Sequence, residues 1–119
     1  MFRLIKRRIA IRSYVFKLSQ KLSPRFGKKS HYSIEEVTET ARDADFSMAY
    51  IAYAHAIFCN RTDFEAYYEQ LRVRCTYDDL RATVSRRYFK GIRDFDAASV
   101  ITATKRTNEG NFYESGIGT

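Results

Sequence analysis

Apolar residues recur along the start of the chain at the three- and four-residue spacing that is typical of an amphipathic α-helix. The spacing predicts a helix from Phe2 to Leu22, and the Ser23–Pro24 step is expected to end it. Because one apolar stripe is enough to dock a helix on a core, the presence of a second stripe predicts another partner or deeper burial. The first stripe consists of Leu4, Ile11, Val15, Leu18 and Leu22. The second stripe consists of Phe2, Ile5, Ile9 and Phe16.

The later helices are indicated by apolar spacing and by start signals. Ser33 with Glu36, and Thr62 with Glu65, have the spacing of a capping box, in which each side chain bonds the other residue's backbone N–H. Residues 47–59 are apolar almost all round, which is typical of a helix buried on most sides. No alternating strand pattern of useful length is evident. The expected later helices span about 34–44, 47–59, 63–74, 77–89 and 96–106.

These elements predict an all-α fold, a compact single-domain array of five or six short helices around a buried central helix at about 47–59. The chain has 119 residues, enough for one core but too few for two. Its one proline and five glycines are fewer chain breakers than an all-β sandwich needs. We expect residues 1–29 to form a basic amphipathic helix and loop, residues 30–107 the helical core, and residues 108–119 a flexible tail.

The sequence predicts neither a membrane span nor a secretory signal. The longest stretch without a charged side chain runs from Phe46 to Asn60, short of the roughly 20 residues that cross a bilayer. Basic residues interrupt the apolar N-terminus, whereas a signal peptide needs about 7–15 uninterrupted apolar residues. The two cysteines, Cys59 and Cys75, are too few for a disulfide scaffold. We therefore expect a cytoplasmic protein with reduced thiols.

Charge is distributed unevenly along the chain. The formal net charge is +7, and residues 1–29 contain ten lysines or arginines and no acid. Residues 30–70 contain eight acids against only two bases, Arg42 and Arg61. A one-sided basic block attracts polyanions such as nucleic acid, anionic lipid or an acidic protein face. The alternative is that the charges pair within the protein, because the basic first helix would also be neutralised if it lay beside the acidic second helix.

We favour a non-catalytic binding protein whose partner is RNA, DNA or a ribonucleoprotein. In the run 85–93, four basic residues interleave with Tyr88 and Phe89, so that arginines would contact phosphates while an exposed ring stacks on a base. The alternative is that the bases complement the helix dipole and that both rings belong to the core. The candidate polyanion-binding residues are Arg3, Lys6, Arg7, Arg8, Arg12, Arg86, Arg87, Lys90 and Arg93.

Two other functions fit the same basic helix. In peripheral association with an anionic membrane surface, apolar side chains enter the lipid interface while neighbouring bases meet the headgroups. In the other function, the basic helix of a small helical adaptor docks on an acidic protein surface. The candidate membrane-contact residues are Phe2, Leu4, Ile5 and Ile9.

The sequence does not favour an enzyme or a metal protein. His55 and Cys59 lie four residues apart and would share one face of a helix, which is half of a metal site that His31 and Cys75 would complete. Neither cysteine has a partner at the short spacing of a zinc knuckle, so we interpret His55 as a buried core histidine. We find no nucleophile–base pair and no glycine-rich phosphate loop. We therefore expect no catalytic residue, no cofactor and no small-molecule substrate.

Three parts of the chain carry a resemblance to a known family. Residues 32–91, the closing segment Asn111-Phe112-Tyr113-Glu114-Ser115-Gly116 and the basic start Phe2-Arg3-Leu4-Ile5-Lys6-Arg7-Arg8 resemble a family of small uncharacterised bacterial proteins, known only as a domain of unknown function. The resemblance implies a compact, bacterial, single-domain protein. It brings no activity and no catalytic residue to this chain.

Overall fold

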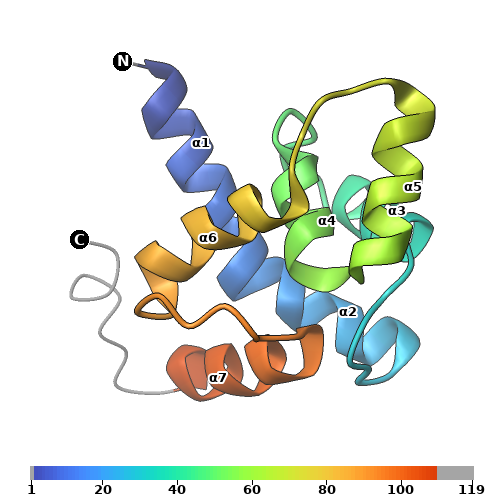
Figure 1. Ribbon diagram of the computed structural model, residues 1–119. Helices are drawn as coiled ribbons and strands as arrows, with labels where there is room; N and C mark the ends of the chain where they lie inside the picture. The colour runs from blue at the N-terminus through green and yellow to red at the C-terminus, as the bar shows by residue number, and fades with distance from the viewer. Residues whose placement is uncertain (1, 110–119) are drawn as a thin grey trace.

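The computed structural model describes the backbone of residues 2–109 and the side chains of residues 5–105. Over that range the chain forms six helices and no strand, because the first three helical segments run on without a break (Figure 1). The first helix comprises α1 (Phe2–Ser13), the π-helical turn η1 (Tyr14–Leu18) and α2 (Ser19–Phe26). The other helices are α3 (Ile34–Asp43), α4 (Ile51–Phe58), α5 (Arg61–Leu71), α6 (Tyr77–Tyr88) and α7 (Ala97–Glu109). The all-α prediction is confirmed.

The first helix runs through Pro24, so the predicted end at Ser23 is wrong. Proline removes one N–H donor from the last turn, but the ring of Phe26 in that turn packs against Tyr32, with 6.4 Å between the ring centroids. Gly27 ends the helix instead, with a φ of 85° that favours glycine, and its N–H donates to the Ser23 carbonyl over 2.8 Å.

The two apolar stripes of the first helix differ in burial. From the first stripe, the structure buries Ile11, Val15, Leu18 and Leu22. In the second stripe, Phe16 is buried and packs edge-on against Tyr88, with 5.5 Å between the ring centroids. Ile5 and Ile9 remain 51% and 60% exposed. Among the described members of the second stripe, deeper burial therefore accounts only for Phe16.

One of the two predicted capping boxes forms. The Glu36 N–H donates to Ser33 Oγ over 3.0 Å, and the Ser33 N–H donates to Glu36 Oε1 over 2.9 Å. The box predicted at Thr62 is wrong, because Asn60 caps α5 and its side-chain oxygen accepts the Asp63 N–H over 2.8 Å. Asparagine caps helices as well as serine does, which allows the earlier start.

The central helix is shorter than predicted, since α4 begins at Ile51 rather than near residue 47. The hydroxyl of Tyr14 donates to the Ser47 carbonyl over 2.5 Å and fastens the segment before α4 to the first helix. Asp45, after the end of α3, has a left-handed φ of 64°. Every residue from Ala54 to Cys59 is buried, so the central, buried position of this helix is confirmed.

A buried arginine joins three segments of the core. Arg81 of α6 is only 8% exposed, and its guanidinium donates to the carbonyls of Ala56 over 2.9 Å and Arg93 over 2.8 Å, and also to that of Phe95. The guanidinium lies over the Phe95 ring, 3.8 Å from its centroid. Because the Ala56 carbonyl lies in the C-terminal half of α4, the positive charge also complements the helix dipole. Burial lowers the pKa of Arg81.

The last helix packs against the first one. Asp96 caps α7 by accepting a backbone N–H three residues on over 2.8 Å. Ser19 Oγ and Thr104 Oγ1 form a buried hydrogen bond of 3.0 Å between the two helices. α7 extends to Glu109, past the boundary predicted at residue 107. The rest of the predicted flexible tail, residues 110–119, lies outside the described residues.

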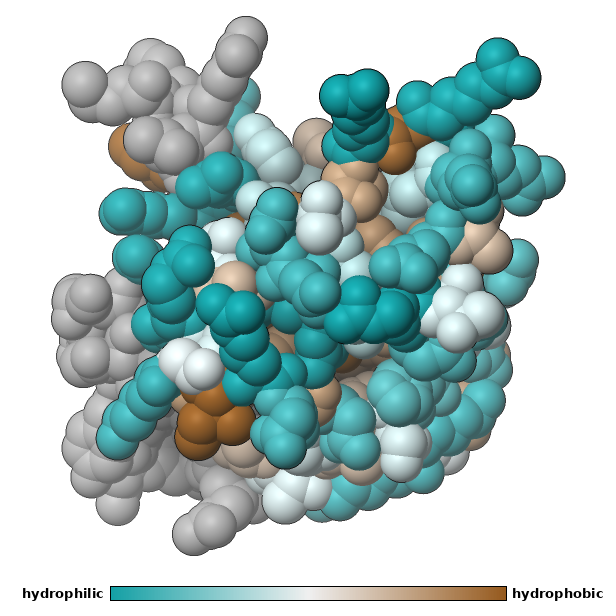
Figure 2. Space-filling view, viewed as in Figure 1, coloured by the Kyte–Doolittle hydropathy of each residue, from teal (hydrophilic) through white to brown (hydrophobic). Residues whose placement is uncertain are grey.

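One face of the molecule is mostly polar (Figure 2). Figure 2 shows hydrophilic side chains over most of one face, with small hydrophobic patches between them. In the part of the chain that the structure describes, no helix is long and apolar enough to cross a membrane.

Candidate polyanion-binding site

Arginines from the start of the chain and from α6 converge on one hollow. In Figure 1, α6 crosses the first helix. Side chains from both helices line a hollow with a volume of about 240 Å³. We call this space the arginine hollow. It is lined by Arg7, Arg8 and Ile11 of α1 and by Thr83, Arg86 and Arg87 of α6.

Helical spacing directs these side chains to the hollow. Arg7 and Ile11 are four residues apart and lie on the same side of α1. Ile11 is buried, so it fixes the side of α1 that faces the body of the protein. On α6, Thr83 lies three residues before Arg86, and its hydroxyl donates to the Asp79 carbonyl over 3.1 Å. The two helices thus bring together arginine pairs that lie far apart in the sequence.

The arginine hollow concentrates positive charge. None of its lining residues is an acid. Among the described residues, Arg7, Arg8 and Arg86 form no ion pair, and Nε of Arg7 is buried without a hydrogen-bond acceptor. Like charges at this range repel one another, and a buried donor without an acceptor costs free energy. A bound anion would relieve both effects, so the arrangement is suited to anion binding.

The aromatic residues beside these arginines belong to the core, so the predicted exposed stacking ring is wrong. Tyr88 and Phe89 are both half-buried. Tyr88 packs against Phe16, and Phe89 packs against Phe95 with 4.8 Å between the ring centroids. The alternative interpretation, in which both rings pack on the core, is confirmed.

Arg12 also lies near this cluster, on the side of Tyr88. Burial raises the pKa of Tyr88, and the positive charges of Arg87, Arg12 and Arg8 oppose that increase. These three guanidinium groups therefore lie close enough to Tyr88 to act on it electrostatically. Together with Arg7 and Arg86, they form a basic face at the arginine hollow.

The other predicted polyanion-binding residues lie outside the hollow. Lys6 lines a separate groove on α1. Lys90 follows the end of α6 and is exposed, with a left-handed φ of 55°. Arg93 follows α6, is exposed and does not line the hollow. The side chains of Phe2, Arg3 and Leu4 lie outside the described part of the chain.

Internal pairing with the acidic helix accounts for part of the basic block. A nitrogen of Arg25 lies 2.8 Å from an Asp43 oxygen, and Lys29 Nζ lies 2.9 Å from Glu36 Oε2. Both pairs join α3 to α2 or to the loop that follows it. Such exposed pairs contribute about 0–1 kcal/mol each. Charge pairing within the protein thus occurs at the C-terminal end of the basic block of residues 1–29. These two pairs do not include the arginines that line the hollow.

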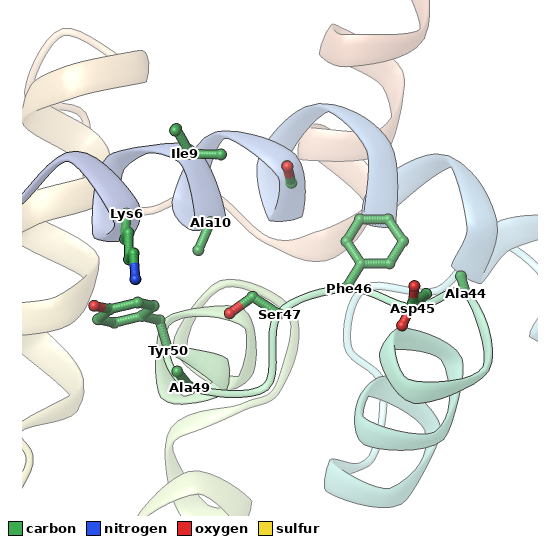
Figure 3. Close-up of a pocket in the computed structure, with 10 residues that line it drawn as sticks. Lys6, Ile9, Ala10, Ala44, Asp45, Phe46, Ser47, Ala49 and Tyr50 are labelled. Atoms are coloured by element: carbon green, nitrogen blue, oxygen red, sulfur yellow. The ribbon is translucent and has the colours of Figure 1, made fainter. Parts of the chain in front are cut away.

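A larger groove lies between α1 and the segment before α4 (Figure 3). Its volume is about 700 Å³. In Figure 3, Lys6 and Tyr50 lie at one end, with the Lys6 ammonium directed toward the ring, and Phe46 lies toward the other end. Most of the remaining lining is alanine and serine, and Asp45 offsets the charge of Lys6. This groove therefore lacks the excess positive charge that a polyanion requires.

The histidine predicted to belong to the core does so. His55 is fully buried, with Nε2 lying 2.7 Å from Thr38 Oγ1 and Nδ1 lying 2.6 Å from the Tyr68 hydroxyl. Both ring nitrogens are therefore occupied by hydroxyl groups. Cys59, which shares the helix, is also buried, and burial raises the pKa of its thiol. The interpretation of His55 as a buried histidine with satisfied nitrogens is confirmed.

Burial of His55 makes stability depend on pH. Burial lowers the pKa of His55 from 6.5 to about 4, so only the unfolded chain binds this proton between those values. Stability should therefore fall as the pH falls from about 6.5 to 4, with about 2–3 kcal/mol lost by pH 4.5, and this contribution is absent above pH 7. Urea denaturation at pH 7 and pH 4.5 measures the loss. The variant His55→Gln should lose less over this range, and an equal loss in both proteins would contradict the prediction.

Two residues that shape the site were missed by sequence reasoning. Thr83 lines the hollow and Arg81 holds the segment after α6 against α4. Arg81 lies four residues after Tyr77 and three before Val84, and both of those residues are buried. Its place on the apolar face of α6 was the signal that could have identified it.

Comparison with known proteins yields a family but no activity. A family of unknown function (DUF6559) matches residues 1–118. This match confirms the resemblance drawn from the sequence to a domain of unknown function, while the bacterial origin stays a prediction. No curated protein and no solved structure matches the chain.

Proposed function

The chain belongs to this family of unknown function, which assigns no activity, and we therefore propose a function from the geometry: the protein binds nucleic acid without catalysis. The basic face formed by α1 and α6 would contact the phosphate backbone of RNA or DNA. The cytoplasm is the proposed location.

One observation carries the proposal, the convergence of four arginines from two helices on the arginine hollow. Folding a chain so that like charges meet costs electrostatic free energy, and contact with a polyanion reverses that cost. Arginine suits this role because its planar fork donates two parallel hydrogen bonds to phosphate oxygens. The core packing of Tyr88 and Phe89 supports contact with the backbone rather than stacking on bases.

The salt dependence of binding tests the proposal. Four phosphate contacts with single-stranded RNA predict a slope of about −3 for log affinity against log salt concentration, so affinity should fall about 50-fold between 50 and 200 mM salt. Fluorescence anisotropy with a labelled RNA oligonucleotide measures this slope. Absence of binding at 50 mM salt would refute the proposed function.

A second candidate, peripheral membrane association, is favoured by the outer face of α1. Ile5 and Ile9 are more than half exposed there, and Lys6 and Arg8 flank them in the sequence. Such an arrangement suits the interface of an anionic bilayer. Flotation with phosphatidylglycerol vesicles but not with phosphatidylcholine vesicles, lost in the double variant Ile5→Ser with Ile9→Ser, would identify this function.

A further inference from the structure

We propose that the arginine hollow binds one phosphate monoester, the terminal phosphate of a nucleic-acid strand. This inference rests on the proposed function and names the part of the nucleic acid that the site selects. The shared chemistry is a phosphate group with three free oxygens, as distinct from the backbone phosphodiester with two.

The size of the hollow limits it to a small group. Its volume of about 240 Å³ equals that of roughly eight water molecules at about 30 Å³ each. That space accommodates one phosphate group with part of its sugar, whereas a double helix is too large to enter it. The hollow lies between two helices and is therefore concave, which suits the end of a strand.

The charge and the free donors match a monoester better than a diester. A phosphate monoester carries a charge of about −1.5 to −2 at pH 7 and three strong acceptor oxygens, whereas each backbone diester carries one charge. Two helices supply guanidinium groups to the same space, and Nε of Arg7 has no acceptor among the described residues. Compared with a diester, the additional oxygen of a monoester would accept hydrogen bonds from these donors, and its additional negative charge would offset their positive charge.

The position of the apolar residues favours a strand end over a lipid headgroup. Ile9 lies about 160° around the helix from Ile11, which lines the hollow, because consecutive residues are about 100° apart. Arg7 lies about 160° from both Ile5 and Ile9, whereas Arg8 lies only about 60° from Ile5. A flat membrane that received both isoleucines would therefore lie near Arg8 but face away from Arg7, so a lipid headgroup in that membrane would not fill the hollow.

The test compares one RNA decamer with and without a 5′-phosphate, each labelled at its 3′ end. The full-length protein should bind the phosphorylated strand about tenfold more tightly or better at 150 mM salt, because hydrogen bonds between charged groups have at least that effect. Fluorescence anisotropy gives both affinities. Inorganic phosphate should compete with the phosphorylated strand for the hollow and so reduce the preference for the phosphorylated over the unphosphorylated strand.

Variants separate bidentate binding from charge. The double variant Arg7→Lys with Arg86→Lys keeps the charge and should lose most of the preference while still binding both strands. The neutral variant Arg7→Gln with Arg86→Gln should lose the preference and also affinity. The matched control is Arg42→Gln with Arg74→Gln, which removes two exposed arginines outside the hollow and should retain the preference. Circular dichroism establishes that each variant is folded.

The outcomes distinguish this inference from the proposed function. Equal, salt-dependent affinity for the two strands would overturn the monoester site and leave nucleic-acid binding intact. Failure to bind either strand would overturn both. Binding to phosphatidic acid vesicles without binding to phosphorylated RNA would place the monoester in a lipid and overturn the inference for nucleic acid.

Discussion

Replacement of Arg81 by methionine should lower the free energy of unfolding by about 3–5 kcal/mol. Its guanidinium donates to three backbone carbonyls, two of which lie in the segment after α6, and methionine would leave all three without this donor. Each buried carbonyl left without a donor costs about 1–3 kcal/mol. For a domain with a stability of about 5–15 kcal/mol, this loss is a large fraction of the total.

Arg61→Met is the matched control for this prediction. The guanidinium of Arg61 also lies over the Tyr77 ring, at 5.0 Å from its centroid, compared with 5.2 Å for Arg81. However, Arg61 is about half exposed and pairs with the exposed carboxylates of Glu65 and Asp78. Its loss should therefore destabilise the protein much less than the loss of Arg81. Guanidinium chloride denaturation measures both variants, and equal effects would show that stacking on Tyr77, rather than the carbonyl contacts, dominates.

Reversing the charge of the arginine hollow should abolish nucleic-acid binding without unfolding the protein. The triple variant Arg7→Glu, Arg8→Glu and Arg86→Glu lowers the formal net charge from +7 to +1. Affinity for single-stranded RNA at about 50 mM salt should fall at least about 100-fold, because phosphate contacts become repulsive. Arg7 is half-buried, the other two residues are exposed, and their mutual repulsion is removed. The melting temperature should therefore change by less than about 4 °C or rise.

A control with the same change of charge isolates the effect of position. The triple variant Lys17→Glu, Lys21→Glu and Arg42→Glu alters three exposed bases outside the hollow and should retain most of the affinity. Anisotropy and thermal denaturation are measured on both triple variants. If reversal in the hollow unfolds the protein while RNA binding by the unmodified protein is absent, the arginines serve folding and the proposed function is wrong.

Features that depend on neighbours in the sequence were predictable. Apolar spacing located all six helices, and the capping box of Ser33 and Glu36 formed as expected, because both depend on residues within one or two turns. Boundaries that depend on distant contacts were not predictable. The segment before α4 is held by the hydrogen bond from Tyr14 to the Ser47 carbonyl, and no local pattern indicates that contact.

The candidate site shows the same division. The sequence indicated that Arg7, Arg8, Arg86 and Arg87 are basic and on helices, and it assigned them to one function. It did not indicate that they meet, because no local pattern specifies which helices cross or at which residues. The apolar face of α6 could have indicated that Arg81 is buried, but the sequence did not indicate its partners, because backbone carbonyls carry no sequence signal.

The contact between the two ends of the described chain affects the order in which the protein completes its fold. The first helix is synthesised before α7, yet Ser19 and Gln20 find their hydrogen-bond partners in Thr104 and Ile101 of α7. Contacts between residues so far apart form slowly, because the intervening chain must be ordered first. Until α7 is synthesised, the part of the first helix that packs against α7 stays exposed to water, and exposed apolar surface makes folding intermediates prone to aggregation. A polyanion that binds the basic side of the first helix during synthesis would therefore bind before α7 has packed against that helix.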